Sequence, residues 1–126
     1  VLVADDVPVS RALLVELLGS LGFDVAEAAD GAQALQLARS QRPDLVLLDN
    51  GMPTLSGLEA TQQLRADPML ATVPVIAVSA SASVADRQRC LAAGASVFLP
   101  KPVDVHELLL QIGRVMGLRW TGAGDR

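Results

Sequence analysis

Five short apolar runs alternate with five stretches that carry apolar residues at helical spacing, and this alternation restricts the possible folds more than any other feature. The apolar runs cover residues 1–4, 24–28, 45–48, 73–78 and 96–99, and the helical stretches cover residues 8–21, 31–40, 57–66, 84–93 and 105–116. Strands that alternate with helices pair in parallel, because each helix returns the chain to the end of the sheet where the previous strand began. We therefore predict a parallel sheet with helices on both faces.

The polarity of the runs indicates their order in the sheet. Runs 1–4, 45–48 and 75–78 are apolar on both faces, as the central strands of a parallel sheet are. Run 24–28 alternates with polar residues, which suits an edge strand. Among doubly wound α/β folds this favours a flavodoxin-like (βα)5 sheet with strand order 2-1-3-4-5, in which ligands bind beyond the carboxyl ends of the strands.

Composition argues against two classes of function. Hydrophobic residues make up 51% of the chain and charged residues 19%, so a buried core is feasible. The net charge of −4 argues against nucleic-acid binding, because nothing gathers Lys and Arg into a phosphate-binding patch. The uninterrupted apolar runs are far too short to span a membrane, so we expect no membrane contact.

The 126 residues leave room for one domain. We place this domain at residues 1–117 and interpret residues 118–126 as a C-terminal tail or linker. The sequence opens inside the first predicted strand without an initiator methionine. This favours a piece of a longer polypeptide, or a chain trimmed of a leader.

Polar residues follow the predicted strands at the end where such a fold binds its ligands. Asp5 and Asp6 follow the first strand, Asp49 the third, Ser79 the fourth and Lys101 the fifth. Three carboxylates at one sheet edge repel each other, and a hard divalent cation such as Mg²⁺ removes that cost. We therefore predict a magnesium site at this edge.

The same residues suit phosphoryl transfer. A transferred phosphoryl group spreads its charge over three oxygens. Mg²⁺ would hold one oxygen, the Lys101 ammonium a second, and the Ser79 hydroxyl with backbone N–H groups, such as that of Ala80, the third. Asp49 would be the nucleophile, because a carboxylate can form an acyl phosphate.

Several segments, taken together and in order, resemble the response-regulator receiver domains of two-component signalling, the CheY-like superfamily. They are Asp5-Asp6, residues 44–53, Ser56-Gly57, residues 78–80 and residues 94–102. The resemblance extends over residues 1–116. It implies a cytoplasmic domain whose Asp49 accepts a phosphoryl group, with Mg²⁺ as cofactor. The donor would be the phosphohistidine of a histidine kinase or of a histidine phosphotransfer protein.

The resemblance also implies which groups bind the metal. Asp6, Asp49 and the main-chain carbonyl of Gly51 would bind it directly, and Asp5 would bind it through water. Gly51 departs from relatives that carry a side chain there, so it offers nothing to shield or orient an attacking water.

A phosphate-binding and switching role is implied for three further residues. Lys101 and Ser79 would bind the phosphoryl group, and the Lys101-Pro102 peptide bond would be cis, as in relatives. Ser79 and Phe98 would switch the surface formed by the fourth helix, fifth strand and fifth helix. Phe98 lacks the hydroxyl of a tyrosine, so such a switch would depend on burial of its ring.

Two other functions remain as alternatives. A pseudo-receiver would be an interaction module that is never phosphorylated, although such modules have lost an acid or the lysine, and both are present here. An aspartyl-nucleophile phosphohydrolase would need a second acid at position 51 and a cap domain, whereas position 51 is Gly. We expect the isolated domain not to be an enzyme, although it would promote its own phosphorylation and dephosphorylation.

The wider context is indicated by four segments that resemble receivers fused to hybrid sensor histidine kinases. They are residues 7–11, 57–61, 90–95 and 117–120. The partner would then be the kinase's own phosphohistidine or a phosphotransfer domain. A stand-alone regulator is the alternative.

Overall fold

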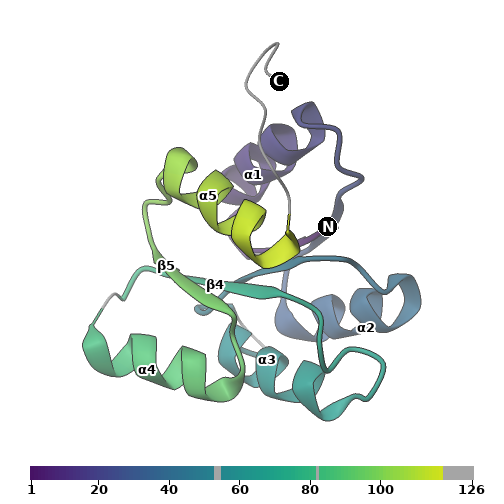
Figure 1. The fold of residues 1–126 in the computed structure, drawn as a ribbon, viewed down its shortest axis with the longest axis vertical. Coiled ribbons are helices and arrows are strands. Elements are labelled where there is room, and N and C mark those ends of the chain that lie inside the picture. Colours follow the sequence, from purple (N-terminus) through teal and green to yellow (C-terminus); the bar gives the residue numbers. More distant parts are fainter. Residues whose placement is uncertain (53–54, 82, 118–126) are drawn as a thin grey trace.

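The computed structural model describes residues 1–52, 55–81 and 83–117, in which five strands alternate with five helices (Figure 1). Along the chain these are β1 (Leu2–Ala4), α1 (Pro8–Ser20), β2 (Ala26–Ala28), α2 (Gly31–Gln41), β3 (Val46–Asp49), α3 (Gly57–Ala66), β4 (Val75–Ser79), α4 (Val84–Ala93), β5 (Val97–Pro100) and α5 (Val105–Met116). None of the described helices is long and apolar enough to cross a membrane. The predicted tail lies outside the described residues, so the domain boundary at residue 117 stays a prediction.

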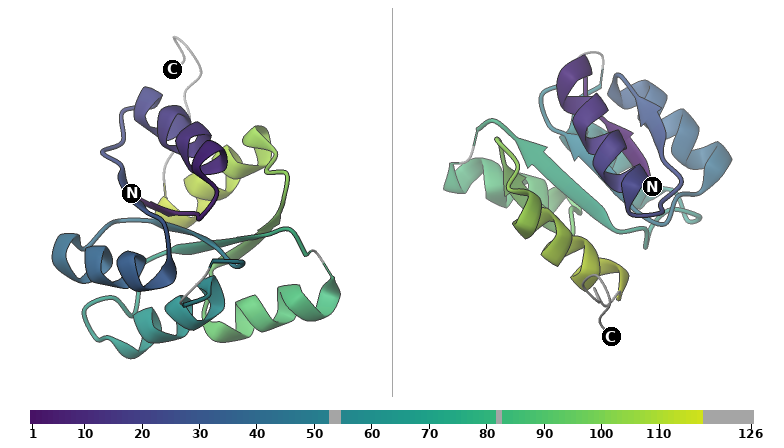
Figure 2. Two further views of the ribbon diagram at one scale, coloured as in Figure 1. Left: turned by 180° about the vertical axis from the view of Figure 1, so that it is seen from behind. Right: turned by 90° about the horizontal axis from the view of Figure 1, so that it is seen from above.

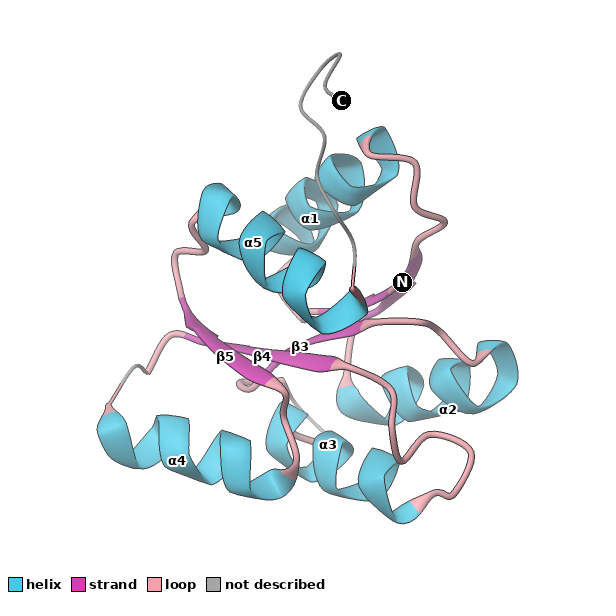
Figure 3. Ribbon diagram, viewed as in Figure 1, coloured by secondary structure: helices cyan, strands magenta, loops and turns pink. Residues whose placement is uncertain are grey.

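The five strands form one parallel sheet in the order β2-β1-β3-β4-β5, which confirms the predicted topology (Figure 3). β1, β3 and β4 are buried along their whole length, whereas β2 at the edge exposes Glu27. Strands that are apolar on both faces are therefore internal, and the strand with alternating polarity lies at the edge.

The ends of the strands differ slightly from those predicted. β2 begins at Ala26 rather than at residue 24, because its neighbour β1 is only three residues long and pairs with it from Leu2 onward. β3, β4 and β5 each continue one residue further, to Asp49, Ser79 and Pro100. Two predicted site residues therefore occupy the last position of a strand, where pairing with the next strand fixes their main chain.

Helices cover both faces of the sheet (Figures 1 and 2). α1 and α5 lie on one face, and α2, α3 and α4 lie on the other. Alternate strand residues point into two apolar clusters, one on each face. Val3, Leu47 and Ile76 belong to the cluster on the α1 and α5 side, and Leu2 and Leu48 belong to the other.

The start of α3 lies directly against the end of β3. The helix begins with a capping box, in which the Ser56 hydroxyl accepts from the Glu59 N–H at 3.2 Å and the Glu59 carboxylate accepts from the Ser56 N–H at 3.1 Å. A Cβ on Gly57 would lie 2.6 Å from the main-chain oxygen of Asp49. Glycine at this position therefore allows the helix to approach the strand end that carries Asp49.

Candidate functional site

The three predicted acids meet at the carboxyl-terminal edge of the sheet. β1 and β3 are parallel neighbours, so Asp5 and Asp6 after β1 lie beside Asp49 at the end of β3. One carboxylate oxygen from each residue lies within 4.8 Å of the other two. Asp5 and Asp49 are only 2% and 6% exposed, whereas Asp6 is open to solvent. The cluster thus combines two buried anions with a third that water can reach.

Lys101 brings a positive charge into this cluster from beyond β5. Its Nζ lies 3.4 Å from Oδ2 of Asp5 and 3.1 Å from Oδ2 of Asp49. Burial alone would lower the pKa of the Lys101 ammonium, but the hydrogen bond and charge of Asp49, with those of Asp5, outweigh it and raise that pKa. Lys101 is the only lysine in the sequence, so the one lysine ammonium of the chain is committed to this site.

Backbone donors orient the two buried carboxylates. Oδ1 of Asp5 accepts from the Val7 N–H at 2.9 Å, and Oδ1 of Asp49 accepts from the Gly51 N–H at 3.2 Å. In both residues the other carboxylate oxygen faces Lys101. The acids are therefore held with one oxygen on the main chain and one directed at the ammonium.

Ser79 lies at the end of β4, next to the strand that carries Asp49. Its neighbour Val78 pairs with Asp49, and the Ser79 hydroxyl is buried and accepts from the Ser81 N–H at 3.1 Å. The Lys101 N–H donates to the Ser79 carbonyl at 2.9 Å, which ties the two loops together. The predicted cis peptide bond between Lys101 and Pro102 is present, and Ala80 is exposed at the rim.

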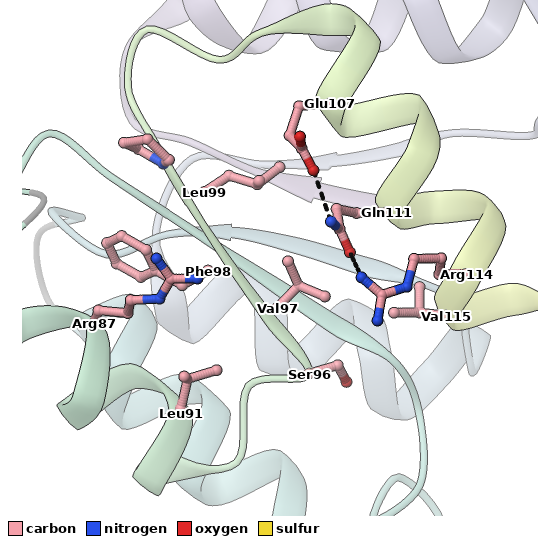
Figure 4. Close-up of a pocket in the computed structure, with 11 residues that line it drawn as sticks. Arg87, Leu91, Ser96, Val97, Phe98, Leu99, Glu107, Gln111, Arg114 and Val115 are labelled. Carbon is pink, nitrogen blue, oxygen red and sulfur yellow. Dashed lines mark hydrogen bonds between the residues drawn. The ribbon is translucent and has the colours of Figure 1, made fainter. Parts of the chain in front are cut away.

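Phe98 lies further from the acids, in β5 between α4 and α5 (Figure 4). Its ring is 5% exposed and packs in the cluster on the α2, α3 and α4 side. Across β5 from the ring, α5 carries a chain of hydrogen bonds from Arg114 to Gln111 and from Gln111 to Glu107. The predicted switch depends on burial of this ring, and the ring is already buried in this structure. A switching role for Phe98 stays a prediction.

The donor set suits Mg²⁺. This ion prefers one or two carboxylates and keeps several of its waters, so it needs anionic oxygens on one side and access to solvent on the other. The buried oxygens of Asp5 and Asp49 beside exposed Asp6 meet both conditions. Gly51 lies next to the cluster, because its N–H donates to Oδ1 of Asp49. The role of its carbonyl as a metal ligand stays a prediction.

One residue near the acids was not predicted from the sequence. Nη1 of Arg11 in α1 donates to the main-chain carbonyl of Asp5 at 2.8 Å, and its Nε lies 3.2 Å from Oε1 of Glu27 in β2. The available signal was a basic residue six positions after Asp5, the fourth residue of a helix that starts at Pro8. That signal could not show which strand the arginine contacts.

Comparison with known proteins identifies the family. The sequence model of the family described as 'Response regulator receiver domain' matches residues 1–113. The polar-differentiation response regulator DivK of Brucella anthropi is 35% identical over 117 residues, which are 93% of this chain and 95% of that protein. The sensor histidine kinase RcsC of Escherichia coli K12 is 43% identical over 105 residues, which are 83% of this chain but 11% of that protein.

Solved structures agree with the sequence comparison. The receiver domain of the sensor histidine kinase PA1611 from Pseudomonas aeruginosa has a TM-score of 0.85 and 40% identity, over 92% of this chain and 95% of that one. It was crystallised with a magnesium ion coordinated in its active-site cleft. A putative response regulator from Chloroflexus aurantiacus has a TM-score of 0.88 and 27% identity, over 92% and 95% of the two chains. The chain therefore belongs to the response regulator receiver domain family of two-component systems.

Proposed function

We propose that this chain is the phosphoacceptor of a cytoplasmic two-component phosphorelay and that Asp49 takes a phosphoryl group from a partner's phosphohistidine. The observation that carries the proposal is the Lys101 ammonium, 3.1 Å from Asp49 and 3.4 Å from Asp5, beside an acidic cluster of magnesium-binding type. A cation held beside the nucleophile and a second acid can stabilise the negative charge on the oxygens of the transferred phosphoryl group.

In the proposed step a carboxylate oxygen of Asp49 attacks phosphorus, the bond from phosphorus to the histidine nitrogen breaks, and the imidazole leaves with the electron pair of that bond. Lys101 would move from the free carboxylates to a phosphoryl oxygen, and the Ser79 hydroxyl and the Ala80 N–H would take another. The Gly51 N–H, 3.2 Å from Oδ1 of Asp49, would keep the acid oriented during attack.

Magnesium would be held by Asp6, Asp49 and the Gly51 carbonyl, with Asp5 acting through water. When bound there, it would neutralise charge on the phosphoryl oxygens. The repulsion among the three acids supports this assignment, because a divalent cation removes it.

The phosphoryl group would bring three acceptor oxygens and carry about −1.5 to −2 charges at neutral pH, in place of the single charge of the Asp49 carboxylate, and this can draw the loop after Ser79 inward. Movement of that loop would alter the packing of Phe98 and so the surface of α4, β5 and α5 (Figure 4). Because the ring is already buried, we propose that the switch changes what it packs against rather than whether it is buried.

A protein donor suits this site better than a small phosphate ester. An apolar groove formed mainly by α1 and the segment before α5 adjoins Asp5 and Lys101, and its lining includes Leu13, Val103 and Val105. Leu13 is 64% exposed and Val105 is 50% exposed, which leaves an apolar surface open beside the acids. We propose that a helix of the phosphohistidine protein covers it.

The likeness to RcsC and to the PA1611 receiver favours a receiver of the hybrid-kinase type. The donor would then be a phosphohistidine of the kinase itself or of a phosphotransfer protein.

Labelling with acetyl phosphate, or with a phosphorylated histidine kinase, tests the proposal. We expect Mg²⁺-dependent incorporation of phosphate into the unchanged chain and none into Asp49→Asn. Asp24→Asn, an exposed acid before β2, is the matched control and should label normally. Continued labelling of Asp49→Asn would refute the assignment of the acceptor. Absence of labelling in the unchanged chain would favour the pseudo-receiver, and sustained turnover of phosphate esters would favour a phosphohydrolase.

A further inference from the structure

Arg11 bridges two strands at the point where the acidic segment leaves the sheet. Its Nη1 donates to the Asp5 carbonyl at 2.8 Å, and its Nε forms an ion pair with Glu27 at 3.2 Å. The guanidinium is planar and its donors point in fixed directions, so it can hold both acceptors at once. Arg11 therefore links the residue after β1 to the edge strand β2.

The sheet register explains why Glu27 is available to this arginine. Glu27 pairs with Val3, and parallel in-register neighbours point to the same face of a sheet. Val3 belongs to the apolar cluster on the α1 side, so Glu27 also faces α1, where Arg11 lies. Because β2 is the edge strand, its glutamate can stay partly in water while it bonds to Arg11.

The main chain of Asp5 is fixed on both sides. Its N–H donates to the Ala28 carbonyl at 3.1 Å, which continues the pairing of β1 with β2 by one residue. β2 ends at Ala28, and the side chain of Arg11 supplies the donor for the next main-chain group, the Asp5 carbonyl. The peptide between Asp5 and Asp6 is therefore held by Arg11.

We propose that Arg11, anchored by Glu27, is a positioning residue that sets the geometry of Asp5 and Asp6 for Mg²⁺. This inference rests on the proposed function, because it assumes that the acidic cluster binds the ion. Arg11 acts through the main chain of Asp5, and Glu27 balances its charge.

Charge alone predicts the opposite effect of losing Arg11. Removal of a cation close to three carboxylates should tighten the binding of a divalent cation. Loss of positioning should weaken it, because the acids would no longer be held in place for the ion. The sign of the change in Mg²⁺ affinity therefore separates the two explanations, and a purely structural role would lower the melting temperature without changing the affinity of the folded protein.

The experiment measures the Mg²⁺ dissociation constant by calorimetry, at a temperature where melting curves show each variant folded. We expect Arg11→Gln to weaken Mg²⁺ binding by about tenfold, at the lower end of what loss of a supporting partner of a metal ligand costs. The matched control is Arg39→Gln, which also removes one positive charge and one partly exposed ion pair, with Asp67, and should bind Mg²⁺ normally. Equal or tighter binding by Arg11→Gln would overturn the proposal.

Two further variants keep the test decisive. Arg11→Lys retains the charge but not the fork, so it should bind Mg²⁺ more weakly than the unchanged chain. If Arg11→Gln does not fold, unchanged binding by Arg11→Lys overturns the proposal instead. As a single substitution, Glu27→Gln should weaken Mg²⁺ binding. Combined with Arg11→Gln it should have no further effect, because Glu27 acts through Arg11. Additive losses would contradict that coupling.

The outcomes also separate this proposal from the proposed function. If the unchanged chain binds Mg²⁺ and Arg11→Gln binds it equally well, only the role of Arg11 is overturned. If the unchanged chain does not bind Mg²⁺ at all, the proposed function fails and the role of Arg11 fails with it.

Discussion

Substitution of Asp49 by Asn should leave the metal-free protein at least as stable as the unchanged chain. In the absence of metal, Asp49 faces two like charges, from Asp5 and Asp6, and one opposite charge, from Lys101. With an effective dielectric constant of about 20, each like charge at the 4.8 Å limit costs about 3.5 kcal/mol, and the ammonium at 3.1 Å returns about 5 kcal/mol. At that limiting separation the charges on balance oppose Asp49 by about 2 kcal/mol, and the screening of exposed Asp6 by water reduces this figure.

Urea denaturation in the presence of a chelator measures this difference. We expect Asp49→Asn to be between about 0 and 2 kcal/mol more stable than the unchanged chain, since the amide keeps the shape of the carboxylate but not its charge. Addition of Mg²⁺ should reverse the order. The unchanged chain gains about 2.7 kcal/mol at a metal concentration near one hundred times its dissociation constant, whereas the variant has lost a ligand and gains little.

Two results would refute this reasoning. A loss of more than about 1 kcal/mol in metal-free Asp49→Asn would mean that attraction to Lys101 outweighs the repulsion among the acids. An equal gain from Mg²⁺ in both proteins would mean that Asp49 is not a ligand. Asp24→Asn, which lies away from the cluster, should behave as the unchanged chain in both conditions.

Three further predictions follow from distances and exposure at the site. Gly57→Ala would place a methyl group 2.6 Å from the Asp49 carbonyl, so we expect a loss of about 1–3 kcal/mol in urea denaturation together with reduced phosphate labelling. The matched control, Gly19→Ala in α1, meets nothing within 4 Å and should not destabilise; equal losses in both would contradict the prediction. The raised pKa of Lys101 means that its stabilising effect is complete below its ordinary pKa of 10.5 and is lost as pH rises through the raised value. Carbon NMR of the single labelled lysine should therefore show a titration midpoint above 10.5, and a midpoint at or below that value would contradict the assigned pairing. Leu13→Asp, on the exposed apolar surface, should slow transfer from a phosphohistidine protein but leave labelling by acetyl phosphate unchanged, and equal slowing with both donors would point to damage of the site itself.

The sheet could be predicted because local polarity and strand order depend on each other. The polar residues Asp24 and Glu27 in run 24–28 indicate the edge strand, and the fully apolar runs indicate the centre. The meeting of Asp5, Asp6 and Asp49 followed, because neighbouring parallel strands end at one edge.

What could not be predicted depends on how separate elements are placed against each other. The bond between Arg11 and the Asp5 carbonyl requires the packing of α1 beside β2, which no local pattern specifies. The burial of Phe98 depends on its rotamer and on the position of α4. The close approach at Gly57 likewise arises from the angle at which α3 leaves β3.

Direct chemical mapping of the acceptor decides whether Asp49 carries the phosphoryl group. Borohydride reduces an aspartyl phosphate to homoserine, and peptide mass spectrometry then locates the altered residue. After treatment with acetyl phosphate and Mg²⁺, we expect homoserine at position 49 and unchanged aspartate at positions 5 and 6. Homoserine at either of those positions, or phosphate incorporated with position 49 unaltered, would contradict the proposed phosphoacceptor.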